Sequence, residues 1–94
     1  MTANNKIIIT VSGTDKVGIV AKVATILAEL NVNIEDIKQT LMQGHFVMFM
    51  LCDITNSPKS FKEIKDRLQE EGEQLKMEIW VQRKEIFDTM HTVG

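Results

Sequence analysis

The amino-acid sequence predicts an α+β sandwich, in which two helices cover one face of a four-stranded antiparallel sheet. Three observations predict it: the length, the composition and the order of the hydrophobic periodicities. The chain has 94 residues, which suits one domain rather than two. Hydrophobic residues make up 44% and charged residues 26%, a composition that argues against intrinsic disorder. Periods typical of strand, helix, strand, strand, helix and strand then follow one another.

The first strand and the first helix are predicted over residues 6–12 and 19–30. The strand is rich in β-branched side chains, which favour a pleated sheet. Its residues on one face are Ile7, Ile9 and Val11. After the turn-rich loop 13–18 the period changes, and apolar residues recur at helical spacing up to Leu30. Residues 31–33 end this helix.

A β-hairpin is predicted next. Residues 34–42 form its first strand, with a bulge expected near Asp36 because the alternation is less clean there. Residues 43–45 form a tight turn around a glycine. Residues 46–53 are apolar on both faces, which is typical of a central strand covered on both sides.

A second helix and a last strand complete the pattern. The helix is expected to begin with Ser57 as N-cap and Pro58 at its first position, and Gly72 suits the C′ position after its end. Residues 74–83 alternate as a strand, and the tail 85–91 predicts a short helix. The inward-facing residues are Phe61, Ile64 and Leu68 on the helix and Leu75, Met77, Ile79 and Val81 on the strand; the tail carries Ile86, Phe87 and Met90.

Two split βαβ units with right-handed crossovers give the ferredoxin-like βαββαβ sandwich. Both helices then cover one face of the sheet, so one apolar row of strand 46–53 needs another cover. The candidate rows for the open face are Phe46, Met48 and Met50 with Trp80, or alternatively Val47, Phe49 and Leu51. The tail or a second copy of the chain would supply the cover.

Several functions known for this architecture lack their residues here. RNA-recognition domains present aromatics on one face of the sheet, but Phe46 and Phe49 point to opposite faces. Eleven basic and thirteen acidic residues give a net charge of −2, which argues against a nucleic-acid surface. Phosphatases of this fold need an arginine after the first strand, and none precedes Arg67.

Metal and catalytic sites are not predicted either. The first loop has no Cys-x-x-Cys pair, and His45 and His91 lie far apart. The single cysteine, Cys52, is expected to be a small buried hydrophobe. We identify no nucleophile with a nearby base, because Ser12 and Thr14 read as turn residues. We therefore expect no catalysis, no cofactor and no metal.

No segment predicts export or membrane insertion. The longest apolar stretch, residues 46–52, is far shorter than the ~20 residues that cross a bilayer. The start of the chain has no secretion-signal pattern. We therefore expect a cytoplasmic protein without a membrane partner.

The first loop, Gly13-x-Asp15-x-x-Gly18, carries the most specific pattern. Gly18 begins a helix, where free N–H groups and the helix dipole suit a carboxylate. Asp15 would face the amine of the same ligand, and Asn33 would reach the same end of the sheet. The alternative is structural: Asp15 caps the helix, Gly18 relieves crowding against a strand, and Asn33 fills a turn.

Together with this loop, the segments Asn33-Ile-Glu-Asp-Ile-x-Gln39 and Phe46-x-Met48-x-Met50 resemble the ACT domain family. The resemblance spans residues 6–83 and is closest to the small stand-alone bacterial and archaeal proteins of the uncharacterised UPF0237 group. It implies a single ACT domain over 1–94, with a tail at 84–94.

The resemblance also implies a function. It implies a regulatory, non-enzymatic module that works as a homodimer, binds an amino-acid-type effector at the subunit interface and regulates another protein in trans. The ligand-binding residues expected from it are Asp15, Val17, Gly18, Ile19 and Asn33. Serine-responsive members carry His and Asn where this chain has Gly13 and Asp15, and many members have Pro in place of Val17. An interaction module that has lost its ligand is therefore the alternative.

Overall fold

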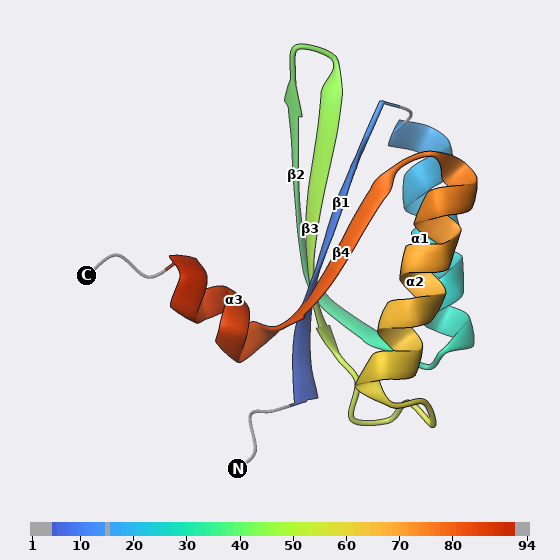
Figure 1. Ribbon diagram of the computed structural model, residues 1–94, viewed down its shortest axis with the longest axis vertical. Coiled ribbons are helices and arrows are strands. Elements are labelled where there is room, and N and C mark those ends of the chain that lie inside the picture. Colours follow the sequence, from blue (N-terminus) through green and yellow to red (C-terminus); the bar gives the residue numbers. More distant parts are fainter. Residues whose placement is uncertain (1–4, 15, 92–94) are drawn as a thin grey trace.

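The computed structural model describes residues 5–14 and 16–91. Its elements follow the predicted order, with a short helix after the last strand (Figure 1). They are β1 (Lys6–Gly13), α1 (Lys16–Glu29), β2 (Asn33–Met42), β3 (His45–Asp53), α2 (Phe61–Leu75), β4 (Glu78–Arg83) and α3 (Lys84–His91). The four strands form one antiparallel sheet in the order β2-β3-β1-β4. The predicted ferredoxin-like sandwich is confirmed.

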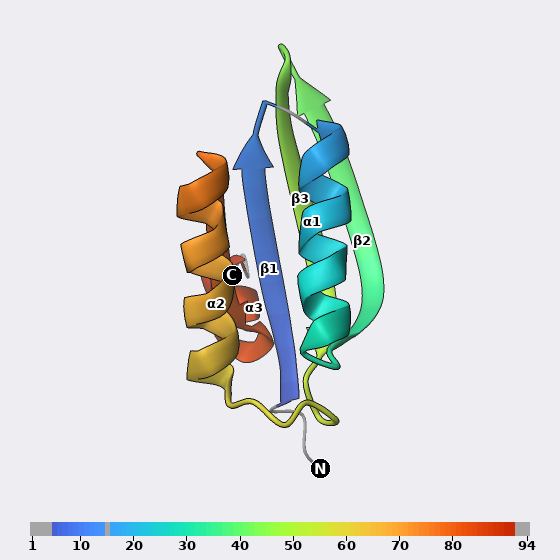
Figure 2. The same ribbon diagram turned by 90° about the vertical axis from the view of Figure 1, so that its right-hand side faces the viewer.

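The two long helices lie on one face of the sheet and α3 lies on the other (Figures 1 and 2). Helix α1 contacts β2, and α2 contacts β4. We call the end where Gly13 pairs with Phe46 the loop end, and the end where Lys6 pairs with Asp53 the far end. Helix α1 runs from the loop end back to the far end, so β2 begins there, with Asn33 opposite Asp53.

Strand β2 contains the expected bulge. Its pairing with β3 shifts between Ile34 and Asp36, so Glu35 is the extra residue. A shift of one residue exchanges the faces of everything that follows it. Ile34 and Ile37 therefore both lie on the helix-covered face, while Asp36 and Lys38 lie on the open face.

The core fills the space between the sheet and the two helices. Of the two candidate rows of β3, the helices cover Phe46, Met48 and Met50, which are at most 1% exposed. The first alternative for the open face is therefore wrong, and the row with Phe49 lies there instead. Trp80 is on the open face as expected and is 59% exposed. Cys52 is fully buried, as predicted.

Helix α2 begins three residues later than predicted. Ser60, not Ser57, is its N-cap, and Pro58 lies in the preceding loop. The Glu63 N–H donates to Ser60 Oγ at 3.2 Å, and the Ser60 N–H donates to Glu63 Oε1 at 2.8 Å. This reciprocal capping box satisfies two helix-end donors, whereas Ser57 Oγ accepts the N–H of Lys59, which lies in the loop before α2.

The end of α2 also differs from the prediction. Gly72 is a buried residue inside the helix, and Lys76 takes the left-handed cap position with φ 59°. A Cβ on Gly72 would lie 3.1 Å from both Ile79 Cγ1 and the Met77 carbonyl oxygen. The glycine therefore allows close packing of α2 on β4. Leu75, expected to face inward from a strand, ends the helix and is 40% exposed.

Helix α3 covers part of the open face, so the tail, one of the two predicted covers, is in place in the structure. The ring of its Phe87 meets that of Phe49 in a tilted pair with centroids 6.3 Å apart. Beneath it, Ile8 of β1 is only 8% exposed. The other half of this face, around Trp80, is uncovered. No helix in the described ranges is long and apolar enough to span a bilayer.

Candidate functional site

A groove at the loop end lies between the start of α1 and the turn from α2 to β4. Its volume is about 260 Å³. Its lining residues are Thr14, Gly18, Ile19, Lys22, Leu75, Lys76 and Met77. Segments from both ends of the sequence thus meet at the predicted loop.

Tight packing at Gly13 fixes the position of this groove. A Cβ on Gly13 would lie 3.0 Å from Ile19 Cδ1 and 3.3 Å from Met77 Cβ, so the loop sits close against both. On the other wall, the Met77 N–H donates to the Gly72 carbonyl at 2.9 Å and closes the turn around Lys76. The backbone therefore brings the start of α1 and the end of α2 to one place.

The groove is cationic. Lys22 and Lys76 both line it, none of the acidic residues that the structure describes does, and the first turn of α1 contains no acidic residue. Neither lysine makes an ion pair with any part of the chain that the structure describes. The first four N–H groups of a helix also lack helical partners and favour an anion. The two lysines and the N-terminal end of α1 together suit a carboxylate or a similar small anion.

The structure brings together some of the predicted ligand-binding residues. Gly18 is exposed and lines the groove, and Ile19 lines it from a largely buried position, 6% exposed. Val17 lies in the first turn of α1. Asp15 falls outside the described residues. Asn33 is exposed at the far end, so the expectation that it reaches the same end within one chain is wrong.

Two features of the site were missed by the sequence reasoning. Lys22 follows Gly18 by four residues and so lies on the same side of α1. This spacing could have been found in the sequence. Lys76 depends on where α2 ends, which was predicted wrongly. Their contribution is charge, which the loop motif alone does not supply.

A Ser–His contact on the open face was also missed. Ser12 Oγ lies 2.6 Å from His45 Nε2, because β1 and β3 pair side by side. Among the described residues no carboxylate bonds the other imidazole nitrogen, so the group that orients a catalytic histidine is lacking. Nor do the described residues contain a cluster of three or more His, Cys, Asp or Glu side chains that could hold a metal.

Comparison with known proteins identifies the family. The family model described as ACT domain matches residues 5–82. A UPF0237 protein of Listeria innocua is 52% identical over 84 residues, which is 89% of this chain and 94% of the relative. A UPF0237 protein of the archaeon Methanocaldococcus jannaschii is 42% identical over 95% of this chain and 99% of its own.

A solved structure agrees with these sequence relatives. The ACT domain protein from Streptococcus pneumoniae is 35% identical and superposes with a TM-score of 0.76, over 95% of this chain and 97% of that one. ACT domains are often regulatory ligand-binding domains. The fold, the family model and the relatives agree, so this chain belongs to the ACT domain family, among its small UPF0237 proteins.

Proposed function

We propose that this protein is a non-enzymatic cytoplasmic regulator that binds a small amino-acid-type effector as a homodimer and acts on another protein in trans. The observation that carries the proposal is the groove at the loop end. It combines the open backbone at Gly18 with two lysines that have no acidic partner among the described residues. The carboxylate of the effector lies at the first turn of α1, between Lys22 and Lys76.

The free edge of β2 supports the proposed dimer. Within the described residues this strand pairs only with β3, so its other edge presents ten residues of backbone to a second copy. Two of its apolar side chains on the helix-covered face are exposed, Ile37 by 39% and Leu41 by 66%. Pairing β2 with its own copy buries both and extends the sheet.

Such a dimer also explains the position of Asn33. Two copies of β2 related by a two-fold axis run antiparallel, so the start of one strand lies at the end of the other. Asn33 of the partner subunit is then carried to the loop end of the first chain, near Gly18. The effector site is completed by two chains, and effector binding is linked to assembly.

This linkage gives effector binding a consequence for another protein. An effector shifts an equilibrium only by binding its two states with different affinity. In this proposal those states are assembly states, or free and partner-bound forms. An effector that contacts both chains favours the dimer and thereby changes the surface offered to a third protein.

The ligand is tested by a thermal-shift screen of the twenty amino acids and common carboxylate metabolites. A ligand at about 100 times its dissociation constant stabilises the fold by about 2.7 kcal/mol, a shift of several degrees. Gly18→Val blocks the helix start and is expected to abolish the shift, and Lys22→Gln and Lys76→Gln weaken it. Lys59→Gln, an exposed lysine outside the groove, is the matched control. A flat screen on a folded dimer contradicts the effector and supports the alternative interaction module.

The dimer is tested separately by light scattering. Leu41→Lys places a charge at the β2 edge and is expected to give a monomer. Ile86→Lys changes an exposed residue on α3, 50% exposed, and should leave the dimer intact. If both variants keep the wild-type mass, or the wild type is monomeric at every concentration, the β2 interface is wrong.

A further inference from the structure

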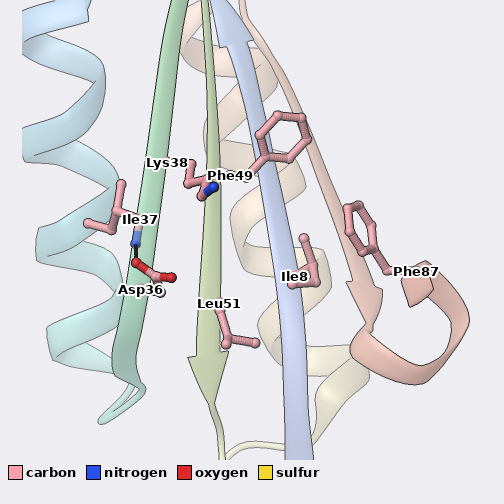
Figure 3. A pocket seen from close by; sticks show the side chains of 7 residues that line it. All are labelled: Ile8, Asp36, Ile37, Lys38, Phe49, Leu51 and Phe87. Atoms are coloured by element: carbon pink, nitrogen blue, oxygen red, sulfur yellow. Dashed lines mark hydrogen bonds between the residues drawn. The ribbon is translucent and has the colours of Figure 1, made fainter. Parts of the chain in front are cut away.

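A second pocket lies on the open face of the sheet, beneath α3 (Figure 3). Its volume is about 150 Å³. It is on the opposite side of the sheet from the groove at the loop end, and its residues belong to β1, β2, β3 and α3. The proposed β2 dimer extends the sheet in its own plane, so it leaves this face open.

Most of the pocket wall is apolar. Its apolar lining residues are Ile8, Ile37, Leu51, Phe49 and Phe87. The tilted pair of Phe49 and Phe87 closes one side, and α3 holds Phe87 in place over the sheet. A cavity of about 150 Å³ lined by Leu, Ile and Phe accepts a molecule the size of benzene. The pocket therefore fits one six-membered ring.

The wall on β2 carries a fixed carboxylate. The bulge in β2 turns Asp36 to the open face, opposite Leu51. Asp36 Oδ1 accepts the Ile37 N–H at 2.9 Å, and this bond holds the short side chain in one orientation. In Figure 3 the other carboxylate oxygen points toward the pocket. A bulge that re-aims a side chain in this way is common beside binding sites.

Lys38 stands next to Asp36 on the same wall but differs from it in mobility. Its side chain is long and exposed, and it forms no ion pair or hydrogen bond with the described residues. A strongly hydrated ammonium on a flexible stem moves aside at little cost, whereas the held carboxylate stays. The fixed carboxylate of Asp36 repels an anionic ligand, so this wall of the pocket favours a cationic one.

We propose that this pocket binds small organic cations in which a short chain joins a primary ammonium to a single apolar ring. The ring lies against Ile8, Leu51 and the two phenylalanines, and the ammonium donates to the free oxygen of Asp36. Phe49 and Phe87 add attraction, because aromatic faces are negative and attract cations nearby. The pocket exists only while α3 is docked, so the ligand also stabilises α3 on the sheet.

The test compares two probes of similar shape and opposite charge, 2-phenylethylamine and 3-phenylpropionate. Each is titrated into ¹⁵N-labelled protein, and amide shifts are followed by NMR. The amine is expected to shift the signals of residues 36–38, Phe49, Leu51 and Phe87, whereas the acid leaves them unchanged. Asp36→Asn keeps the acceptor for the Ile37 N–H and is expected to weaken amine binding about tenfold, the loss typical of one charge-assisted hydrogen bond.

Two further variants sharpen the result. Lys38→Gln removes the nearby positive charge and is expected to tighten amine binding. Gly18→Val lies in the groove at the loop end and is expected to leave amine binding unchanged. A failure of this pocket proposal can therefore be told apart from a failure of the proposed function. The proposal is overturned if the acid binds as well as the amine, if Asp36→Asn has no effect in a folded protein, or if the amine shifts other residues or none.

Discussion

The two faces of β3 are built from the same kind of residue but have different surroundings. Phe46, Met48 and Met50 face the helices and are at most 1% exposed, whereas Phe49, between Met48 and Met50, faces α3 and is 37% exposed. The helix-covered face is a closed core that receives the full benefit of burial. The open face has a single short helix as its cover. The first face therefore stabilises the fold, and the second retains apolar surface that is available for binding.

Thiol reactivity is the largest expected difference between the faces. Cys52 lies on the helix-covered face, where burial raises its pKa to about 12. A disulfide reagent is expected to label it about 1000-fold more slowly in native protein than in urea, because a domain with about 5 kcal/mol of stability is rarely open. In a Cys52→Ala background, Thr40→Cys places a thiol on the exposed open face and should react quickly. Native labelling of Cys52 within tenfold of the unfolded rate contradicts a closed core.

Truncation of the two phenylalanines compares the faces within one strand. Phe46→Ala leaves a cavity in the core and is expected to cost about 3 kcal/mol of unfolding free energy. Phe49→Ala loses a half-exposed ring and its pairing with Phe87, and we expect about 1 kcal/mol. Urea denaturation at one fixed protein concentration measures both. Equal losses would mean that the open face is as closed as the core.

Helix α3 is expected to contribute less than either long helix. Phe87→Ala removes its aromatic contact with the sheet and is expected to cost about 1 kcal/mol. Ile86→Ala, at a neighbouring exposed position, should change stability by less than about 0.5 kcal/mol. Thermal unfolding of the two variants provides the measurement. If the Ile86 variant is the less stable one, α3 docks through its other side.

The smallest expected effect is a pH dependence at the far end of the open face. The hydroxyl and N–H of Thr55, together with the Lys6 ammonium, lower the pKa of Asp53 to about 2. This folded-state pKa is below the unfolded value of about 3.9. The ionised Asp53 therefore stabilises the fold above about pH 4, and this contribution to stability is lost as the pH falls toward 2. Asp53→Asn should flatten that part of a stability profile measured in urea. An unchanged profile would mean that Thr55 and Lys6 do not favour the carboxylate.

Sequence periodicity was sufficient for the order of elements and the bulge near Asp36, whereas it left the tail and a second copy of the chain as alternative covers for the open face. It failed where two local patterns compete. Ser57-Pro58 and Ser60 both look like helix starts, and only Glu63, three residues after Ser60, decides between them through the capping box. Gly72 resembles a helix end, but its role is to admit Ile79 against the helix, which is a tertiary contact.

The sequence could not decide which row of β3 faces the helices, because both rows are apolar. The face is set by the register with β1, in which Val11 pairs with Met48 and Ile9 with Met50. The candidate site was predictable only in part for a similar reason. Gly18 was found from a local motif, whereas Lys76 and the position of Asn33 depend on how distant elements run. Residues brought together by topology are the ones that single-sequence reasoning misses.

The strand order also has a consequence for protein synthesis. A nascent chain emerges N-terminus first, so β1 leaves the ribosome before the other strands. Yet β1 lies between β3 and β4, and Ile9 pairs with Val81, 72 positions later (81 − 9). Until β4 has been translated, one edge of β1 has no partner, and the closure of this long loop slows folding. The strand that is made first is therefore the last to be paired on both sides.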